Sequence, residues 1–243
     1  MKIFIDSANL RDIEEALKRG FIRGITTNPS LLAKEPKAKF EEHIGNIIEL
    51  IKRHQPGISL SVEVFSTDPA EILTQAKRFL NTFKYPELAI KVQIGWDELA
   101  VIRSLAAEGI KVNCTCCMDI PQAVMAAAAG ARYVSLFWGR IREGGTAKYA
   151  NQKKEYIDSG RLEEDDFNPA HVVRETRAIF DRSFPDCEII VGSLRSVADF
   201  TAADRAGAHI VTTPPKFFVP MATHFKTDEV VQQFLTDFSA WLK

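Results

Sequence analysis

The amino-acid sequence predicts a single (β/α)8 barrel over residues 1–243, with a helical insertion between the sixth and seventh strands and a helix at the C-terminus. The chain length of 243 residues matches the usual size of one such barrel. Eight short β-prone segments recur along the chain, most of them separated by stretches with helical periodicity. Most of these segments are nearly continuous in apolar residues, as expected of parallel strands covered on both faces. A doubly wound sheet remains the alternative from pattern alone.

The expected strands and helices alternate along the chain. The strands are expected at residues 2–6, 24–27, 59–65, 88–93, 111–115, 133–137, 188–192 and 209–212. Amphipathic stretches at 10–19, 40–54, 69–83 and 98–108 carry apolar residues at helical spacing and charges on the other face. This alternation predicts parallel βαβ units, and eight such units suggest a closed barrel.

Two segments depart from the regular repeat. The interval between the sixth and seventh expected strands includes the polar segment 148–168, for which we favour a solvated helical insertion over a substrate lid. The final segment, 227–243, is predicted to be a helix with Phe234, Phe238 and Trp241 on one stripe. Such a stripe is typical of packing, and at the end of the chain it could cover a neighbouring subunit.

Composition and charge exclude several classes of function. The chain has 31 basic and 32 acidic side chains and a formal net charge of -1, which gives no general attraction to nucleic acid or anionic membranes. No apolar run approaches the ~18 residues that a membrane span needs, and no signal-peptide core begins the chain. We therefore expect a cytoplasmic protein with no nucleic-acid and no membrane partner. Any anion it binds must be held by a local cluster.

The sequence predicts neither a metal nor an organic cofactor. Cys114, Cys116 and Cys117 crowd one segment while Cys187 stands alone, and the histidines are scattered. Without a His-x3–5-His partner, the cysteines are interpreted as small, buried core residues. No G-x-G-x-x-G motif follows the first expected strand, so a dinucleotide is not expected.

Polar side chains mark the ends of seven expected strands. In a (β/α)8 barrel these C-terminal ends form the active site. Taken singly, each has an ordinary explanation: Asp6 as a helix cap, Asn28 in a turn, Glu63 as an ion-pair partner. Their convergence on one barrel mouth predicts a functional site. Its candidates are Asp6, Thr26, Thr27, Asn28, Glu63, Lys91, Asn113, Thr115, Arg140, Ser193 and Arg195.

Lys91 is the most informative of these residues. It lies in the otherwise apolar run 88–94. A lysine there must be paired, extend to solvent or lose its hydration. Loss of hydration favours the neutral amine, which can attack a carbonyl carbon. The pattern therefore predicts imine chemistry on Lys91, with an internal ion pair to Glu63 or Asp6 as the structural alternative.

Several motifs span nearly the whole chain in a fixed order. They include FIDSAN at 4–9, GITTNPSLLAK at 24–34, VEV at 62–64, IKV at 90–92, AEGIKVNCT at 107–115, YVSLFWGR at 133–140 and GSLRS at 192–196. Together they resemble the small transaldolase and fructose-6-phosphate aldolase family, and TTNPS at 26–30 is the most specific of them. The resemblance implies a lysine Schiff-base enzyme on a (β/α)8 barrel.

The resemblance also implies residue roles. Lys91 would form the Schiff base, Asp6 would act as acid and base, and Glu63 would work through a bound water. Thr115 would help to hold that water and is counted with the catalytic residues. The expected substrate-binding residues are Thr27, Asn28, Asn113 and Phe137, with Arg140, Ser193 and Arg195 on the phosphate.

Two residues favour one branch of the family. Phe137 stands where the aldolases carry tyrosine, and Glu63 stands where they carry glutamine. The expected activity is transfer of a dihydroxyacetone unit from fructose 6-phosphate or sedoheptulose 7-phosphate to an aldose phosphate. The alternatives are a simple class I aldolase and a non-catalytic sugar-phosphate-binding barrel. The expected assembly is a homo-oligomer, a pentamer or a decamer.

The chain departs from the family pattern in places. After the lysine it reads Val92-Gln93-Ile94-Gly95, where the family usually has Ile-Pro-x-Thr. After Thr115 it reads Cys-Cys-Met-Asp at 116–119, where the family usually has Leu-Ile/Val-Phe-Ser. Leu136 replaces a proline. None of these departures affects the lysine itself.

Overall fold

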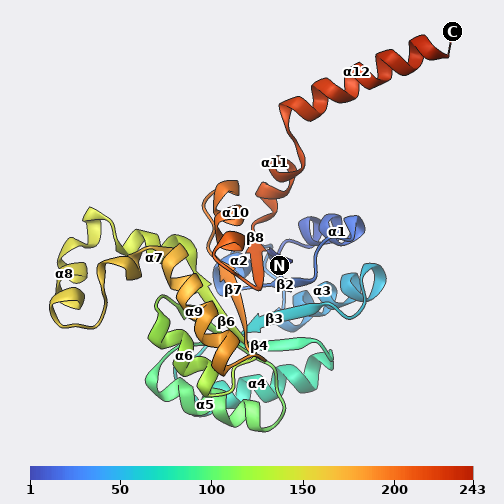
Figure 1. The fold of residues 1–243 in the computed structure, drawn as a ribbon. Helices are drawn as coiled ribbons and strands as arrows, with labels where there is room; N and C mark the ends of the chain where they lie inside the picture. The colour runs from blue at the N-terminus through green and yellow to red at the C-terminus, as the bar shows by residue number, and fades with distance from the viewer. Residues whose placement is uncertain (243) are drawn as a thin grey trace.

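Eight parallel strands close into a barrel in the computed structural model, which describes residues 1–242 (Figure 1). Each strand pairs with the next one along the chain, and the eighth pairs with the first. The strands are β1 (Lys2–Asp6), β2 (Gly24–Thr26), β3 (Ser59–Glu63), β4 (Leu88–Gln93), β5 (Val112–Cys117), β6 (Tyr133–Phe137), β7 (Glu188–Gly192) and β8 (Ile210–Thr213). The predicted (β/α)8 fold is confirmed, and the doubly wound sheet is excluded because the sheet has no open edge.

The strand bounds follow the apolar runs closely. Those predicted for β1, β4, β6 and β7 are confirmed to the residue. The largest difference is in β5, which continues to Cys117 rather than ending at Thr115. Its pairing with β6 shifts between Cys114 and Cys117, and Cys116 lies in the left-handed region with a φ of 64°. A bulge of this kind redirects the side chains beside it.

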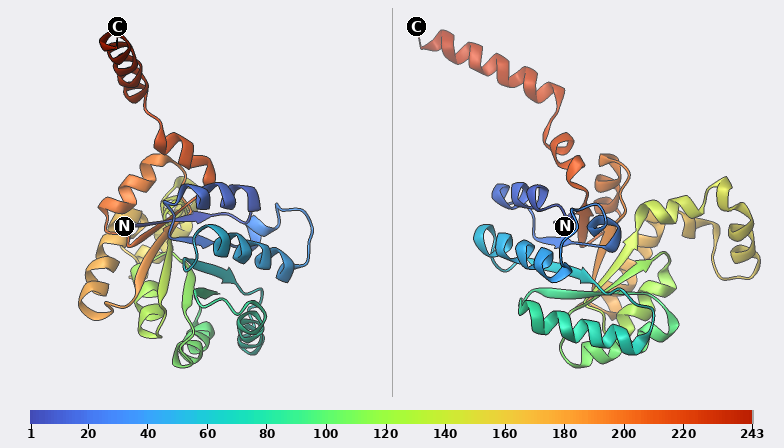
Figure 2. Two further views of the ribbon diagram at one scale, coloured as in Figure 1. Left: turned by 90° about the vertical axis from the view of Figure 1, so that its right-hand side faces the viewer. Right: turned by 180° about the vertical axis from the view of Figure 1, so that it is seen from behind.

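Helices cover the outside of the barrel (Figures 1 and 2). They are α1 (Leu10–Arg19), α2 (Pro29–Leu32), α3 (Phe40–His54), α4 (Pro69–Phe83), α5 (Trp96–Ala107), α6 (Ile120–Ala128), α7 (Trp138–Gly144), α9 (Pro169–Ser183), α10 (Val197–Arg205) and α11 (Phe218–Ala222). The predicted bounds of α1, α3 and α4 are confirmed. Asn9, Asp68 and Asp119 begin α1, α4 and α6, because each side chain accepts a backbone N–H three residues on.

The barrel interior changes from apolar to polar along the strands. Five buried side chains form one cluster: Phe4, Ala89, Tyr133, Ile190 and Ile210. Side chains two residues further along a strand point the same way, so Asp6, Lys91, Ser135 and Thr212 lie on the same inner face, nearer the barrel mouth. Gly24 is required beside Phe4, since a Cβ there would lie 2.4 Å from the phenyl ring. The apolar cluster therefore closes the barrel below its polar end.

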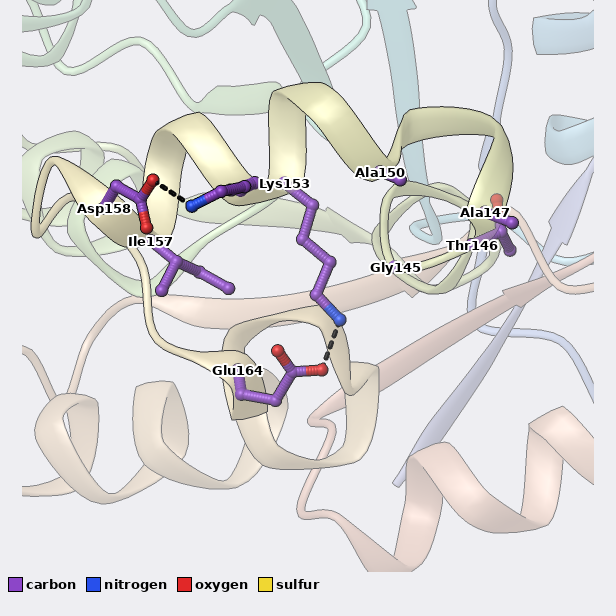
Figure 3. A pocket seen from close by; sticks show the side chains of 9 residues that line it. Gly145, Thr146, Ala147, Ala150, Lys153, Ile157, Asp158 and Glu164 are labelled. Atoms are coloured by element: carbon purple, nitrogen blue, oxygen red, sulfur yellow. Dashed lines mark hydrogen bonds and ion pairs between the residues drawn. The ribbon is translucent and has the colours of Figure 1, made fainter.

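The insertion between β6 and β7 is helical, as predicted. It consists of the 3-10 helix η1 (Ala147–Tyr149), the helix α8 (Ala150–Asp158) and the 3-10 helix η2 (Glu164–Phe167). Lys153 contacts Glu164 across the insertion (Figure 3). Lys154 pairs with Asp158 at 2.5 Å. No residue of α8 is buried. These residues line a separate surface cavity, which supports a solvated insertion over a substrate lid.

The last helix projects away from the barrel. The short helix η3 (Pro215–Phe217) and α11 lead into α12 (Phe225–Trp241), which extends away from the barrel in every view (Figures 1 and 2). The predicted C-terminal helix is confirmed, although its predicted last residue, Lys243, lies outside the described residues. The stripe residues Phe234, Phe238 and Trp241 are 65%, 57% and 79% exposed. Of the helices within residues 1–242, none has the length and apolarity to cross a membrane.

Candidate active site

A cavity of about 500 Å³ lies at the C-terminal ends of the strands. It brings together all of the predicted catalytic and substrate-binding residues except Thr27 and Asn113. The predicted residues in its lining are Asp6, Asn28, Glu63, Lys91, Thr115, Phe137, Arg140, Ser193 and Arg195. The lining also includes Thr26, a candidate at the end of β2, and five residues that were not among the candidates: Lys34, Cys116, Ser135, Gly192 and Thr212.

Lys91 brings a buried amine to this cavity. Its side chain is 6% exposed, and its Nζ lies 2.8 Å from Glu63 Oε2. The same nitrogen donates to the backbone carbonyl of Thr27 at 2.9 Å. Glu63 and Lys91 are opposite one another in the pairing of β3 with β4, so the barrel itself sets this contact. The ion pair with Glu63 satisfies the buried charge and gives the amine a neighbouring proton acceptor.

Asp6 is the second acidic group in the cavity. Its Oδ1 accepts a hydrogen bond from the Thr26 hydroxyl at 2.8 Å, and Thr26 in turn lies 2.6 Å from the Thr212 hydroxyl. Burial raises the pKa of Asp6, against the opposing effects of the Lys91 ammonium and the Thr26 hydrogen bond. The cap of α1 is Asn9, so Asp6 is not a helix cap. A carboxyl group with a raised pKa is suited to both accepting and returning a proton.

The buried polar residues around Lys91 differ in whether they line the cavity. Thr27 donates its hydroxyl to the Ser61 carbonyl, and Asn113 lies between the hydroxyls of Ser61 and Ser135 at 3.2 and 2.7 Å. Both are fully buried, and neither is among the residues that line the cavity. The buried hydroxyl of Thr115, in contrast, lines the cavity and has no hydrogen-bond partner within residues 1–242. It remains free to hold a water or a substrate hydroxyl.

Basic side chains enter the cavity from the ends of β6 and β7. Arg140 lies on α7, directly after β6, and pairs with Glu143 at 2.7 Å. Ser193 and Arg195 lie in the loop between β7 and α10, and Ser193 has a φ of 61°. All three line the cavity with Phe137, the last residue of β6. This arrangement could bind an anion by charge and by hydrogen bonds together.

Cys116 is the one cysteine for which the core prediction is wrong. Cys114, Cys117 and Cys187 are buried, but Cys116 lines the cavity because the bulge in β5 turns it toward the mouth. Burial and the nearby Glu63 carboxylate raise the pKa of the Cys116 thiol. A protonated thiol is a weak nucleophile, so Lys91 is the better candidate. Residues 1–242 contain no group of three or more His, Cys, Asp or Glu arranged to hold a metal.

The other departures lie away from the cavity. Gln93 donates to the Ser66 carbonyl at 2.9 Å and to Glu98 at 3.0 Å. Asp119 accepts from the backbone N–H of Gln122 at 2.8 Å as the cap of α6. Both side chains are therefore used in holding loops and helix ends, and of this set only Cys116 changes the cavity wall.

Comparisons with known proteins agree with this architecture. A solved thiamine phosphate pyrophosphorylase from Pyrococcus furiosus shares the fold, with a TM-score of 0.54 at 10% identity over 88% of this chain and 85% of that one. A mandelate oxidase structure does so too, with a TM-score of 0.53 at 15% identity, although the match spans only 65% of that longer chain.

Sequence relatives are more informative. Probable transaldolases of Symbiobacterium thermophilum and Syntrophobacter fumaroxidans are 33% and 37% identical to this chain over 240 residues. The matches cover 99% and 98% of this chain and 98% and 96% of those proteins. The family model described as Transaldolase/Fructose-6-phosphate aldolase matches residues 3–242. The chain therefore belongs to the transaldolase/fructose-6-phosphate aldolase family.

Proposed function

We propose that this protein is a transaldolase, which moves a dihydroxyacetone unit from fructose 6-phosphate or sedoheptulose 7-phosphate to an aldose phosphate through a Schiff base on Lys91. The observation that carries the proposal is the buried Lys91 amine, in contact with Glu63 and in one cavity with Asp6 and two arginines. A nucleophile, proton-transfer groups and anion-binding groups are the parts that this reaction requires.

The first half of the reaction forms the imine. Glu63 takes a proton from Lys91 across their 2.8 Å contact, and the neutral amine attacks the C2 carbonyl of the ketose. One proton then moves from the nitrogen to the carbinolamine oxygen, and Glu63 returns the proton it took, through a water held near Thr115. The oxygen leaves as water. The resulting protonated imine withdraws electrons from the C3–C4 bond.

The second half breaks and remakes a carbon–carbon bond. Asp6 removes the proton from the C4 hydroxyl, the C3–C4 bond breaks, and its electron pair moves into the imine to form an enamine. The aldose phosphate departs. A second aldose phosphate accepts the enamine carbon, and Asp6 returns its proton to the new hydroxyl. Hydrolysis of the imine then releases the product ketose.

The basic groups at the ends of β6 and β7 should bind the substrate phosphate. We expect Arg140→Ala and Arg195→Ala each to lower kcat/KM for phosphorylated donors by roughly 10- to 100-fold, the effect of losing a hydrogen bond to a charged group. Most of the loss should appear as a higher KM, because the phosphate lies away from the reacting bond. Steady-state kinetics with fructose 6-phosphate and with fructose test this. Equal losses on both donors would contradict a phosphate-binding role.

Phe137 should determine what happens to the enamine. The enamine can react with an acceptor aldehyde, or it can be protonated and then hydrolysed. The second route needs a polar group to place a water. A phenyl ring offers none, so release of glyceraldehyde 3-phosphate from fructose 6-phosphate should depend on an acceptor such as erythrose 4-phosphate. Phe137→Tyr should raise acceptor-independent release roughly tenfold and lower transfer, since the hydroxyl supplies one hydrogen bond.

The same assay separates the two alternative functions. Equal release by the wild-type protein with and without erythrose 4-phosphate would identify a simple aldolase. No turnover, with fructose 6-phosphate still bound, would identify a non-catalytic binding barrel. If Phe137→Tyr lowers only the melting temperature, the phenyl ring serves packing alone.

We also propose that the protein assembles as a pentamer or a decamer. The exposed Phe234, Phe238 and Trp241 of α12 would face water in a monomer. A largely apolar cavity of about 680 Å³ lies between α1 and α11, where a second copy could receive such side chains. Light scattering of the full chain and of Trp241→Ser/Phe238→Ser measures the assembly directly. A monomeric wild-type protein would contradict the proposal.

A further inference from the structure

The anion-binding end of the cavity is built from two separate segments. Arg140 lies on α7, whereas Ser193 and Arg195 lie in the loop before α10. Arginine side chains are long and flexible, so they bind one phosphate together only if their backbones hold a fixed distance. Whatever joins α7 to this loop therefore sets the geometry of the site.

A single carboxylate makes that connection. Asp199 Oδ2 accepts hydrogen bonds from the backbone N–H groups of Arg195 and Ser196, at 2.8 and 3.1 Å. Its other oxygen, Oδ1, accepts from Trp138 Nε1 at 3.2 Å and from the Arg142 guanidinium. One oxygen thus holds the loop that carries Arg195, and the other holds the helix that carries Arg140.

Helix capping explains only part of this arrangement. Ser196 and Asp199 form a capping box at the start of α10, since each side chain accepts the backbone N–H of the other. A capping box needs no contact with α7, so the bonds from Trp138 and Arg142 call for another explanation. Asp199 is only 5% exposed, and a buried carboxylate with four donors is costly to leave with any of them missing.

Two further observations support a connection between α7 and the loop before α10: a direct backbone contact and the charge state of Asp199. The backbone N–H of Gly139 donates to the Ser193 carbonyl at 3.1 Å, and a Cβ at residue 139 would lie 2.4 Å from that oxygen. Burial by itself would raise the pKa of Asp199, but the hydrogen bonds from Arg142 and the loop outweigh it and lower the pKa. The carboxylate therefore stays charged at neutral pH, where both of its oxygens can accept these hydrogen bonds.

We propose that Asp199 is a positioning residue that aligns Arg195 with Arg140, through Trp138 and Arg142, so that both can bind one substrate phosphate. This inference rests on the proposed phosphate-binding role of the two arginines. Asp199 touches no substrate itself, since it lies outside the cavity lining. Its effect should therefore be confined to substrates that carry a phosphate.

The test compares Asp199→Asn with the matched control Asp204→Asn, which removes the same charge from an exposed position of the same helix. Asp199→Asn replaces an acceptor oxygen with a donor on one side of the contact, so one segment is released. We expect its KM for fructose 6-phosphate and its Ki for inorganic phosphate to rise about tenfold, the value of one charge-assisted hydrogen bond. The kinetics with fructose and borohydride trapping of dihydroxyacetone on Lys91 should stay as in the control.

A milder variant decides the question if Asp199→Asn does not fold. Arg142 is 48% exposed on its side chain, so Arg142→Gln leaves the capping box of α10 in place and removes one donor. It should raise the same KM and Ki several-fold. In the double variant, the effect should be no greater than that of Asp199→Asn, because Arg142 acts through Asp199.

Each outcome has a distinct meaning. If Asp199→Asn or Arg142→Gln lowers only the melting temperature, or affects fructose and fructose 6-phosphate alike, the positioning role is overturned. If Arg140→Ala and Arg195→Ala leave the Ki for inorganic phosphate unchanged, the proposed anion site is what fails. If the arginine variants raise that Ki while the Asp199 and Arg142 variants do not, the anion site stands and this inference is wrong.

Discussion

Lys91→Met should leave a folded barrel that neither turns over substrate nor forms a borohydride-stable adduct. The variant keeps a flexible apolar side chain of similar length in β4 but has no amine, so no imine can form. Turnover should fall by roughly 10⁴-fold or more, as when other covalent nucleophiles are removed. In the wild-type protein, reduction in the presence of fructose 6-phosphate should add a three-carbon unit to the peptide that contains Lys91. Peptide mass analysis measures both results.

The ion pair with Glu63 makes a folding control necessary. Removing Lys91 leaves a buried carboxylate without its partner, which can cost about 3–5 kcal/mol of stability. Lys91→Arg keeps a positive charge beside Glu63 but supplies no nucleophile, since a guanidinium does not lose its proton in proteins. It should also be inactive while remaining closer to the wild-type melting temperature. An adduct on another lysine, or activity in either variant, would rule out the Schiff base on Lys91.

The fold was predictable because its pattern is local. Parallel strands buried on both faces read as continuous apolar runs, and the bounds of four strands and three helices were predicted to the residue. The extension of β5 could not be predicted, because a bulge depends on how two strands pair. The direction of α12 could not be predicted either, because it depends on what the helix packs against. The sequence of the helix shows only that one stripe is apolar.

The site was less predictable, because residue type does not reveal which partner a side chain takes. The strand ends identified most of the cavity lining, but Thr27 and Asn113 make side-chain hydrogen bonds to Ser61 and Ser135 and are not part of that lining. Applying the period of two to each strand would have found Ser135 and Thr212 on the inner face. No local signal could find Asp199, since its role depends on Trp138 and Arg142, which lie about sixty positions earlier (separations of 61 and 57).

Asp6→Asn should separate imine formation from carbon–carbon cleavage. The amide retains an acceptor for the Thr26 hydroxyl but cannot remove the C4 proton, so turnover should fall by about 10²–10⁴-fold. Lys91 should still condense with fructose 6-phosphate. Borohydride should therefore trap the intact six-carbon sugar phosphate on Lys91, where the wild-type protein retains three carbons. A three-carbon adduct formed at the wild-type rate would show that another group is the base.

The pH dependence tests the same assignment through Thr26, which contacts the Asp6 carboxylate but has no part in the proposed proton transfer. Asp6 must be ionised to act as the base, and burial raises its pKa, so activity should be lost as the pH falls through this raised value. The Thr26 hydroxyl donates to the ionised carboxylate and opposes the increase. Thr26→Val removes that donor, so the pKa should rise further and the acidic limb of the kcat/KM profile should move to higher pH. Activity at high pH should change little, because the base is ionised there in both proteins. A profile that falls uniformly, without a shift of its acidic limb, would mean that Asp6 does not control it.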